Sequence, residues 1–143
     1  MAINSRFAVG VHILSLLEVN KDGRNTSDYI AASVNTNPVV VRRITSMLSK
    51  AGLVLTSPGV AGAKLARPVE HITLYDVYKA VRDDETDRLF AIHDKPNPDC
   101  SVGQHIQGAL ETNLRQVQAA MENELAGITL SQVIRSIVQP EQV

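Results

Sequence analysis

Two adjacent arginines, Arg42 and Arg43, lie in a segment (residues 37–51) whose apolar side chains recur every three or four positions. This spacing predicts a helix with one apolar face, and it places both arginines on the opposite, solvent-facing side. A guanidinium group can donate two parallel hydrogen bonds to the edge of guanine in the major groove, and each such pair discriminates between bases by roughly 1–3 kcal/mol. Two arginines in isolation, however, are more simply interpreted as a solvated helix face.

A short helix and a tight turn precede the arginine helix and favour the DNA-reading interpretation. Thr26 or Ser27 begins the short helix, and residues 35–37 then form a turn rich in Asn, which tolerates left-handed backbone geometry. Asn37 is expected to cap the arginine helix, with Pro38 in the first helical position, where a missing amide hydrogen costs nothing. This order is that of a helix-turn-helix, which inserts the N-terminal end of its second helix into the major groove.

A β-hairpin is predicted after the arginine helix, with strands at residues 53–56 and 64–67 and a glycine-containing loop between them. Helical spacing predicts further helices at residues 3–19, 73–82, 101–126 and 130–138. The fold class is therefore mainly α with a small β-hairpin: a winged helix-turn-helix domain plus a long C-terminal dimerisation helix. The predicted divisions are residues 1–82 for the DNA-binding domain, 83–100 for a connector, and 101–143 for the dimerisation helix and C-terminal helix.

The residues predicted to contact DNA share outward positions on these elements. Arg42 and Arg43 are expected to meet base edges, and Val39 to touch a thymine methyl group. Ser27 offers a hydroxyl and helix N-terminal amides to a phosphate, and Arg6 is expected to hold the flanking backbone. The full predicted set is Arg6, Ser27, Thr36, Asn37, Pro38, Val39, Arg42, Arg43, Ser46, Lys50, Gly59 and Lys64.

Charge is unevenly distributed along the 143 residues, although the net charge is only −1. Residues 1–67 hold eight basic and three acidic side chains, a balance of +5, whereas residues 68–143 hold six basic and twelve acidic ones, a balance of −6. This asymmetry suits a polyanion-binding front half, although ordinary surface patterning would also produce it. No apolar run is long enough to span a membrane, and we interpret residues 7–17 as a buried first helix of a cytoplasmic protein.

The helix predicted at residues 101–126 carries one continuous apolar seam. Its members step by three or four positions along the whole helix, which is longer than a small DNA-binding head requires. Such a seam suggests a partner helix, and hence a homodimer. The predicted dimerisation residues are Val102, Ile106, Leu110, Leu114, Val117, Met121 and Leu125.

Four blocks of the sequence resemble the bacterial Rrf2 family of winged-helix regulators. They are NPVVVRRI at 37–44, LSKAGLV at 48–54, LARP at 65–68 and ITLYDV at 72–77. The resemblance extends from Ser5 to the long helix, and it implies a homodimer that crosses its long helices and binds a palindromic operator in double-stranded DNA. The hairpin departs from the family pattern: members usually have a basic residue before a Gly-rich turn ending in Tyr, whereas this chain has SPGVAGAK at 57–64.

Cys100, the only cysteine, lies at the predicted start of the long helix. Cluster-binding members of the family carry three cysteines ahead of that helix, so we expect no iron–sulfur cluster, and neighbouring His93 and His105 lack a recognised metal spacing. The helix N-terminus favours a reactive thiolate, while Asp99 opposes it. Cys100 is therefore either a redox sensor or merely a tolerated residue.

The leading hypothesis is a dimeric transcriptional repressor, switched by an oxidant, a small ligand or a partner protein. The alternative is a protein-interaction module on a winged-helix scaffold with weak or lost DNA binding, which the unusual hairpin favours. A thiol enzyme built on Cys100 would lack an orienting third group and an oxyanion site, so we predict no enzymatic activity.

Overall fold

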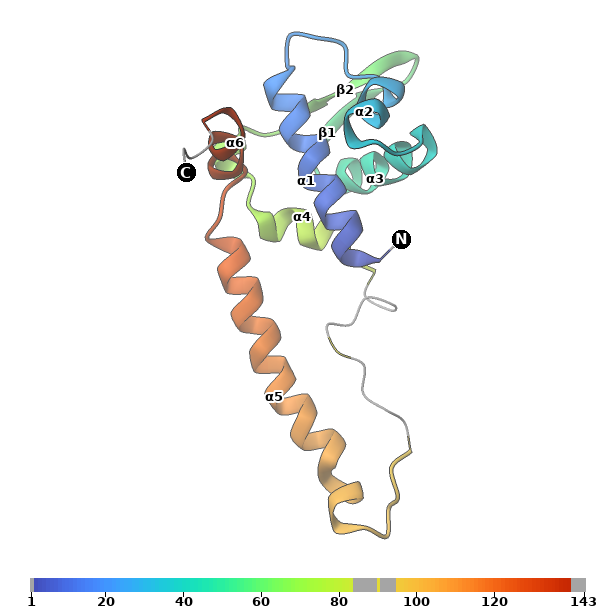
Figure 1. Cartoon of the computed structure of the whole chain (residues 1–143), viewed down its shortest axis with the longest axis vertical. Coiled ribbons are helices and arrows are strands. Elements are labelled where there is room, and N and C mark those ends of the chain that lie inside the picture. The colour runs from blue at the N-terminus through green and yellow to red at the C-terminus, as the bar shows by residue number, and fades with distance from the viewer. Residues whose placement is uncertain (1, 84–89, 91–94, 140–143) are drawn as a thin grey trace.

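The computed structural model describes residues 2–83, residue 90 and residues 95–139 (Figure 1). Helices α1 (Ile3–Val19), α2 (Ser27–Val34), α3 (Pro38–Lys50) and α4 (Leu74–Val81) gather around one core with the hairpin β1 (Val54–Ser57) and β2 (Val60–Leu65). A short 3₁₀ turn, η1 (Val69–His71), joins the hairpin to α4. We call this assembly, with the last helix α6 (Leu130–Val138), the head; the long helix α5 (Ser101–Ala126) projects from it (Figure 1).

Helix α1 runs through the middle of the head. Ile13 and Leu14 are fully buried and Leu17 is nearly so, which confirms the prediction that the apolar stretch at residues 7–17 is a core helix. The core continues into α3, α4 and the start of the hairpin, and it is built almost wholly from aliphatic side chains. Among the described helices, none is both long and apolar enough to cross a membrane.

The polar caps expected from the sequence hold the helix ends in place. The Thr26 hydroxyl accepts a hydrogen bond from the Tyr29 amide (3.1 Å), so Thr26 caps α2 and Ser27 is its first residue. Asn35 has a left-handed backbone (φ 64°) and ends α2, as the predicted tight turn requires. Two capping boxes, Thr73 with Asp76 and Thr129 with Gln132, begin α4 and α6.

The hairpin corrects the predicted strand boundaries. The antiparallel pair aligns Val54 with Leu65 and Leu55 with Lys64, so the second strand begins earlier in the chain than expected. Gly59 lies in the turn, whereas Gly62 lies inside β2 with φ 107°, where a Cβ would meet the Asn25 backbone at 3.5 Å. The sequence could not set this register, because a short strand rich in Gly and Ala lacks a strong alternation of buried and exposed side chains.

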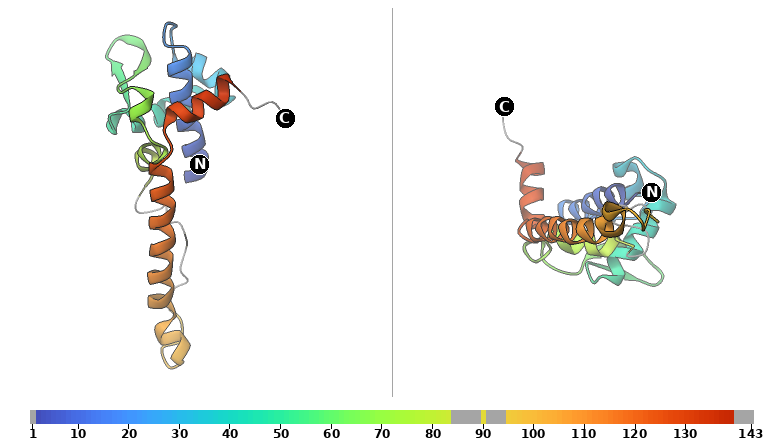
Figure 2. Two further views of the ribbon diagram at one scale, coloured as in Figure 1. Left: turned by 90° about the vertical axis from the view of Figure 1, so that its left-hand side faces the viewer. Right: turned by 90° about the horizontal axis from the view of Figure 1, so that it is seen from below.

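Helices α5 and α6 follow the predicted bounds, but α6 packs on the head rather than continuing along α5 (Figure 2). Leu130 is fully buried, and its amide donates to the Ile72 carbonyl (2.7 Å), while the Leu74 amide donates to the Ile128 carbonyl (2.9 Å). None of the side chains at 101–126 is buried, whereas every helix of the head has at least one buried residue. The apolar seam of α5 therefore has little packing within one chain.

Two predicted segments fall partly or wholly outside the described residues. The connector, predicted at 83–100, is described only at residues 83, 90 and 95–100. His93, weighed above as a metal neighbour of Cys100, belongs to the part of the chain that is not described. Residues 140–143, the end of the predicted C-terminal segment, are likewise outside it.

Candidate nucleic-acid interface

Helix α3 has two opposite faces, as the sequence predicted. Val41, Ile44 and Leu48 are buried in the core, whereas the other side exposes Val39, at 65% of its surface, together with Ser46 and Lys50. A valine exposed to this degree contributes little to the core. Val39, Ser46 and Lys50 are all exposed to solvent, so a duplex groove can reach this side of the helix.

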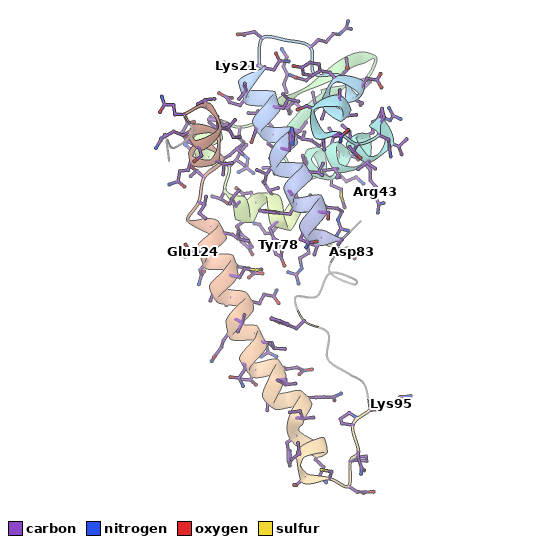
Figure 3. All side chains as sticks on the ribbon, in the orientation of Figure 1. Lys21, Arg43, Tyr78, Asp83, Lys95 and Glu124 are labelled. Atoms are coloured by element: carbon purple, nitrogen blue, oxygen red, sulfur yellow. The ribbon has the colours of Figure 1, made fainter. Side chains whose placement is uncertain are left out.

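The two arginines lie on different flanks of this outward face. Successive residues of an α-helix are about 100° apart, so Arg42 and Arg43 cannot point the same way. Arg42 lines a hollow between α3, the start of α2 and the hairpin. Arg43 extends away from the body of the head (Figure 3). The sequence grouped the two residues as one reading pair, and the structure separates them.

The turn between α2 and α3 presents Thr36 and Asn37 beside Pro38, the first residue of α3. The Asn37 side-chain oxygen accepts a hydrogen bond from the Val40 amide (3.0 Å), so Asn37 caps the helix as expected. Asn37 is exposed at this corner of the head. The Thr36 amide donates to the Ala31 carbonyl (3.0 Å), which fixes the turn against α2.

Arg6 is wrongly assigned by the sequence prediction. Arg6 is only 8% exposed, and its Nε donates a hydrogen bond to the Val81 carbonyl (3.0 Å) at the end of α4. The guanidinium group therefore ties α1 to α4 instead of reaching a flanking DNA backbone. The sequence could not show this, because Arg6 and Val81 are 75 residues apart along the chain.

Replacing Arg6 by alanine is expected to lower the free energy of unfolding by about 1–3 kcal/mol, because a buried carbonyl loses its donor. Urea denaturation measures this, with exposed Arg24→Ala as the control, expected to change stability by no more than about 0.5 kcal/mol. The salt dependence of DNA binding should stay as in the unmodified protein. A stable Arg6→Ala protein with a shallower salt dependence would return Arg6 to the DNA contacts.

Asn25 is a residue that the sequence analysis missed, and it holds the hairpin against the helix-turn-helix. Asn25 is 4% exposed, and its backbone carbonyl accepts a hydrogen bond from the Ala63 amide in β2 (3.2 Å). Its side-chain amide donates to the Asn20 carbonyl (3.1 Å) and its side-chain oxygen accepts from Asn20 Nδ2 (3.0 Å). These bonds fix the hairpin, with exposed Lys64 in β2 and exposed Gly59 in the turn, relative to the start of α2.

Comparison with known proteins identifies the family of this chain. The profile of the Rrf2 family, described as an iron-dependent transcriptional regulator, matches residues 3–136. The chain belongs to the Rrf2 family. The resemblance seen in the four sequence blocks is therefore confirmed, and this Rrf2 protein is a transcriptional regulator by family, not an enzyme.

Relatives of this Rrf2 chain match it over nearly its whole length. It is 50% identical over 135 residues to YwnA of Bacillus subtilis (strain 168), which is named as an HTH-type transcriptional regulator. The aligned residues make up 94% of this chain and 98% of that protein. A crystal structure described as that of a DNA-binding protein has 45% identity and a TM-score of 0.74, covering 90% of this chain and 98% of the other. A transcriptional regulator from Lactobacillus plantarum has a TM-score of 0.79 at 19% identity, covering 94% and 91%, and so shows the shared fold.

Cys100 of this Rrf2 protein is the N-cap residue of α5 and is exposed. The backbone amides of Gly103, and to a smaller extent Val102, lower the pKa of the thiol below its ordinary value. The thiol is thus accessible and more readily ionised than a free cysteine.

The family description mentions iron, but the residues of this chain do not fit an iron–sulfur cluster. Such clusters are held chiefly by several cysteine thiolates, and this chain has one cysteine. Within the described part of the chain, no three His, Cys, Asp or Glu side chains gather closely enough to hold a metal ion.

Proposed function

We propose that this regulator is a homodimer that recognises a palindromic operator in double-stranded DNA and acts as a repressor. One observation carries the proposal: α3 buries one aliphatic side in the head and presents Val39 together with polar and charged side chains, among them Arg43, to solvent on its outer side. In helix-turn-helix proteins this is the side of the helix that enters the major groove. The relatives named as an HTH-type regulator and as a DNA-binding protein support the same conclusion.

The contacts expected on DNA fall into two classes. At the N-terminal part of α3, Arg43 suits a guanine edge and Val39 a thymine methyl group. Thr36, Ser46 and Lys50 flank these positions and suit phosphates or peripheral bases. Lys64 and the Gly59 turn lie further out on the hairpin, where a backbone can approach without a bulky side chain in the way.

Dimerisation is supported by the exposed apolar seam on α5. Val102 is 65% exposed, Val117 48% and Leu110 38%, while Ile106, Leu114, Met121 and Leu125 are half-buried. A helix of 26 residues with a seam of this length is suited to packing against its own copy. Two copies related by a twofold axis present two α3 helices, which is why the operator is expected to be palindromic. Binding to bacterial DNA would place the dimer in the cytoplasm.

The proposal is tested by selecting binding sequences from a pool of random DNA duplexes with the full-length protein. We expect an inverted repeat whose half-sites are centred about 10 base pairs, or a multiple of that, apart. Affinity for the selected duplex should fall steeply as salt rises, since displaced counterions return to the phosphates. A pool that yields no enriched sequence, with only weak binding at low salt, would favour the protein-interaction alternative.

We further propose that oxidation of Cys100 switches the regulator. Three observations support this: the thiol is exposed, its pKa is lowered, and Cys100 caps the end of α5 that lies away from the head (Figure 1). With one cysteine per chain, a peroxide would yield a sulfenic acid, which can then condense with another thiol, including Cys100 of the second copy.

Alkylation of Cys100 measures the ionised fraction directly. Because the folded pKa is lowered, the alkylation rate should rise with pH and reach half its maximum at a lower pH in the folded protein than in the urea-unfolded protein. Cys100→Ser should abolish release of the selected duplex by dilute hydrogen peroxide while leaving affinity in reducing buffer unchanged. If the serine variant still releases DNA on oxidation, Cys100 is not the switch.

A further inference from the structure

A hollow of about 380 Å³ lies between the start of α2, one flank of α3 and the hairpin. Its walls bring together residues that are far apart in the sequence: Ser27 from α2, Arg42 and Lys50 from α3, and Thr56 from β1. Asn25 and Gly62 complete it where the α1–α2 loop meets β2. The Ala63–Asn25 hydrogen bond fixes the distance between these walls, so the hollow is a built feature of the head.

The chemistry of the walls matches a phosphate group. Arg42 and Lys50 supply two positive charges, and hydroxyl groups surround them, from Ser27, Thr45, Ser46, Ser49 and Thr56. Among the described residues that line the hollow, none carries a carboxylate. Ser27 is also the first residue of α2, where backbone amides lack intrahelical acceptors and attract anions. Asp28, the next residue, is exposed but does not line the hollow.

One hydroxyl in the wall has an unmet hydrogen-bonding capacity. Thr45 Oγ1 is buried, and no partner for it is found among the described residues. Buried polar atoms without partners are rare in folded proteins, and an absent ligand is one of their recognised explanations.

We infer that this hollow binds one phosphate group of the DNA backbone in each half-site, and that Arg42 holds the phosphate instead of reading a base. The inference deepens the proposed function and rests on it. The occupant is a DNA phosphate because Ser46 and Lys50 belong both to the hollow and to the outward face of α3, so a duplex on that face brings its backbone over the opening. Base reading then falls to Arg43, on the other flank.

The test compares Arg42→Ala with the unmodified protein on the selected duplex, over a series of salt concentrations and on duplexes with single methylphosphonate substitutions. A methylphosphonate removes the charge of one phosphate. We expect Arg42→Ala to select the same bases but to lower the salt slope by about 0.9 per half-site, because one phosphate contact is lost. At one backbone position per half-site, methylphosphonate should weaken the unmodified protein by roughly tenfold and Arg42→Ala by clearly less, because only Lys50 then supplies charge to the hollow.

The matched control is Arg135→Ala, which removes one exposed positive charge from α6, outside the hollow. Its salt slope and its response to methylphosphonate should equal those of the unmodified protein. Inorganic phosphate at constant ionic strength should compete for DNA no better than sulfate does, since the hollow is completed by the duplex backbone.

Three results would overturn the inference. If Arg42→Ala changes the selected bases, Arg42 reads sequence. If the methylphosphonate effects of the unmodified protein persist in full in Arg42→Ala at every position, the hollow holds no phosphate. If inorganic phosphate competes specifically and Arg42→Ala abolishes that competition, the hollow is a site for a free anion. Failure of the proposed function is distinguishable from these three results, because the unmodified protein would then select no duplex at all.

Discussion

Replacing Val117 by aspartate is expected to convert the dimer into monomers and to lower operator affinity by about 10²–10⁴-fold. The side chain is 48% exposed within one chain, and a charge in the middle of an apolar helix seam would have to be desolvated on pairing. A monomer engages only one half-site, so the gain from linking two binding events is lost. Analytical ultracentrifugation measures the first effect, and titration of the selected duplex the second.

An aspartate introduced two residues further along α5, at Ala119, provides the control. Ala119 is exposed and lies on nearly the opposite side of the helix from Val117, since two residues turn the helix by about 200°. Ala119→Asp should therefore remain dimeric and bind DNA normally. Leu114→Asp, on the same seam as Val117, should reproduce the monomer. A dimer that survives both Val117→Asp and Leu114→Asp would show that the copies pair through another surface.

Replacing Arg43 by alanine is expected to remove the preference for one base in each half-site. A bidentate arginine–guanine pair contributes roughly 1–3 kcal/mol of discrimination, which corresponds to about a 5- to 150-fold preference per half-site. Arg43→Lys is the matched variant, because it keeps the positive charge but loses the two parallel donors. Both variants should therefore lose the base preference, while the lysine variant retains the salt slope.

Competition between the selected duplex and duplexes with every single-base change measures this preference directly. The position that becomes tolerant in Arg43→Ala identifies the base that Arg43 reads. Because the side chain extends into solvent and away from the head, we expect no change in the unfolding transition. An Arg43→Ala protein with an unchanged preference at every position would assign base reading elsewhere on α3.

Several features followed from the sequence because they depend on neighbouring residues. The start of α3 needs only Asn37 and Pro38, and α6 begins at a Thr129–Gln132 capping box. The outward face of α3 follows from the spacing of its apolar residues, because a helix turns by a fixed angle per residue. The long α5 and its exposed seam follow for the same reason, and local patterns of this kind also carried the family resemblance.

Other features were decided only by the tertiary structure. Arg6 was assigned to DNA because its charge could be seen in the sequence, but its hydrogen bond to Val81 comes from packing between α1 and α4. The register and the position of the hairpin depend on the clamp formed by the hydrogen bond between Asn25 and Ala63 of β2, which are nearly forty residues apart along the chain. The separate roles of Arg42 and Arg43 depend on that clamp, because it brings the hairpin alongside one flank of α3 only. Local periodicity fixes which side of a helix faces outward, but contacts between distant segments decide what lies beside it.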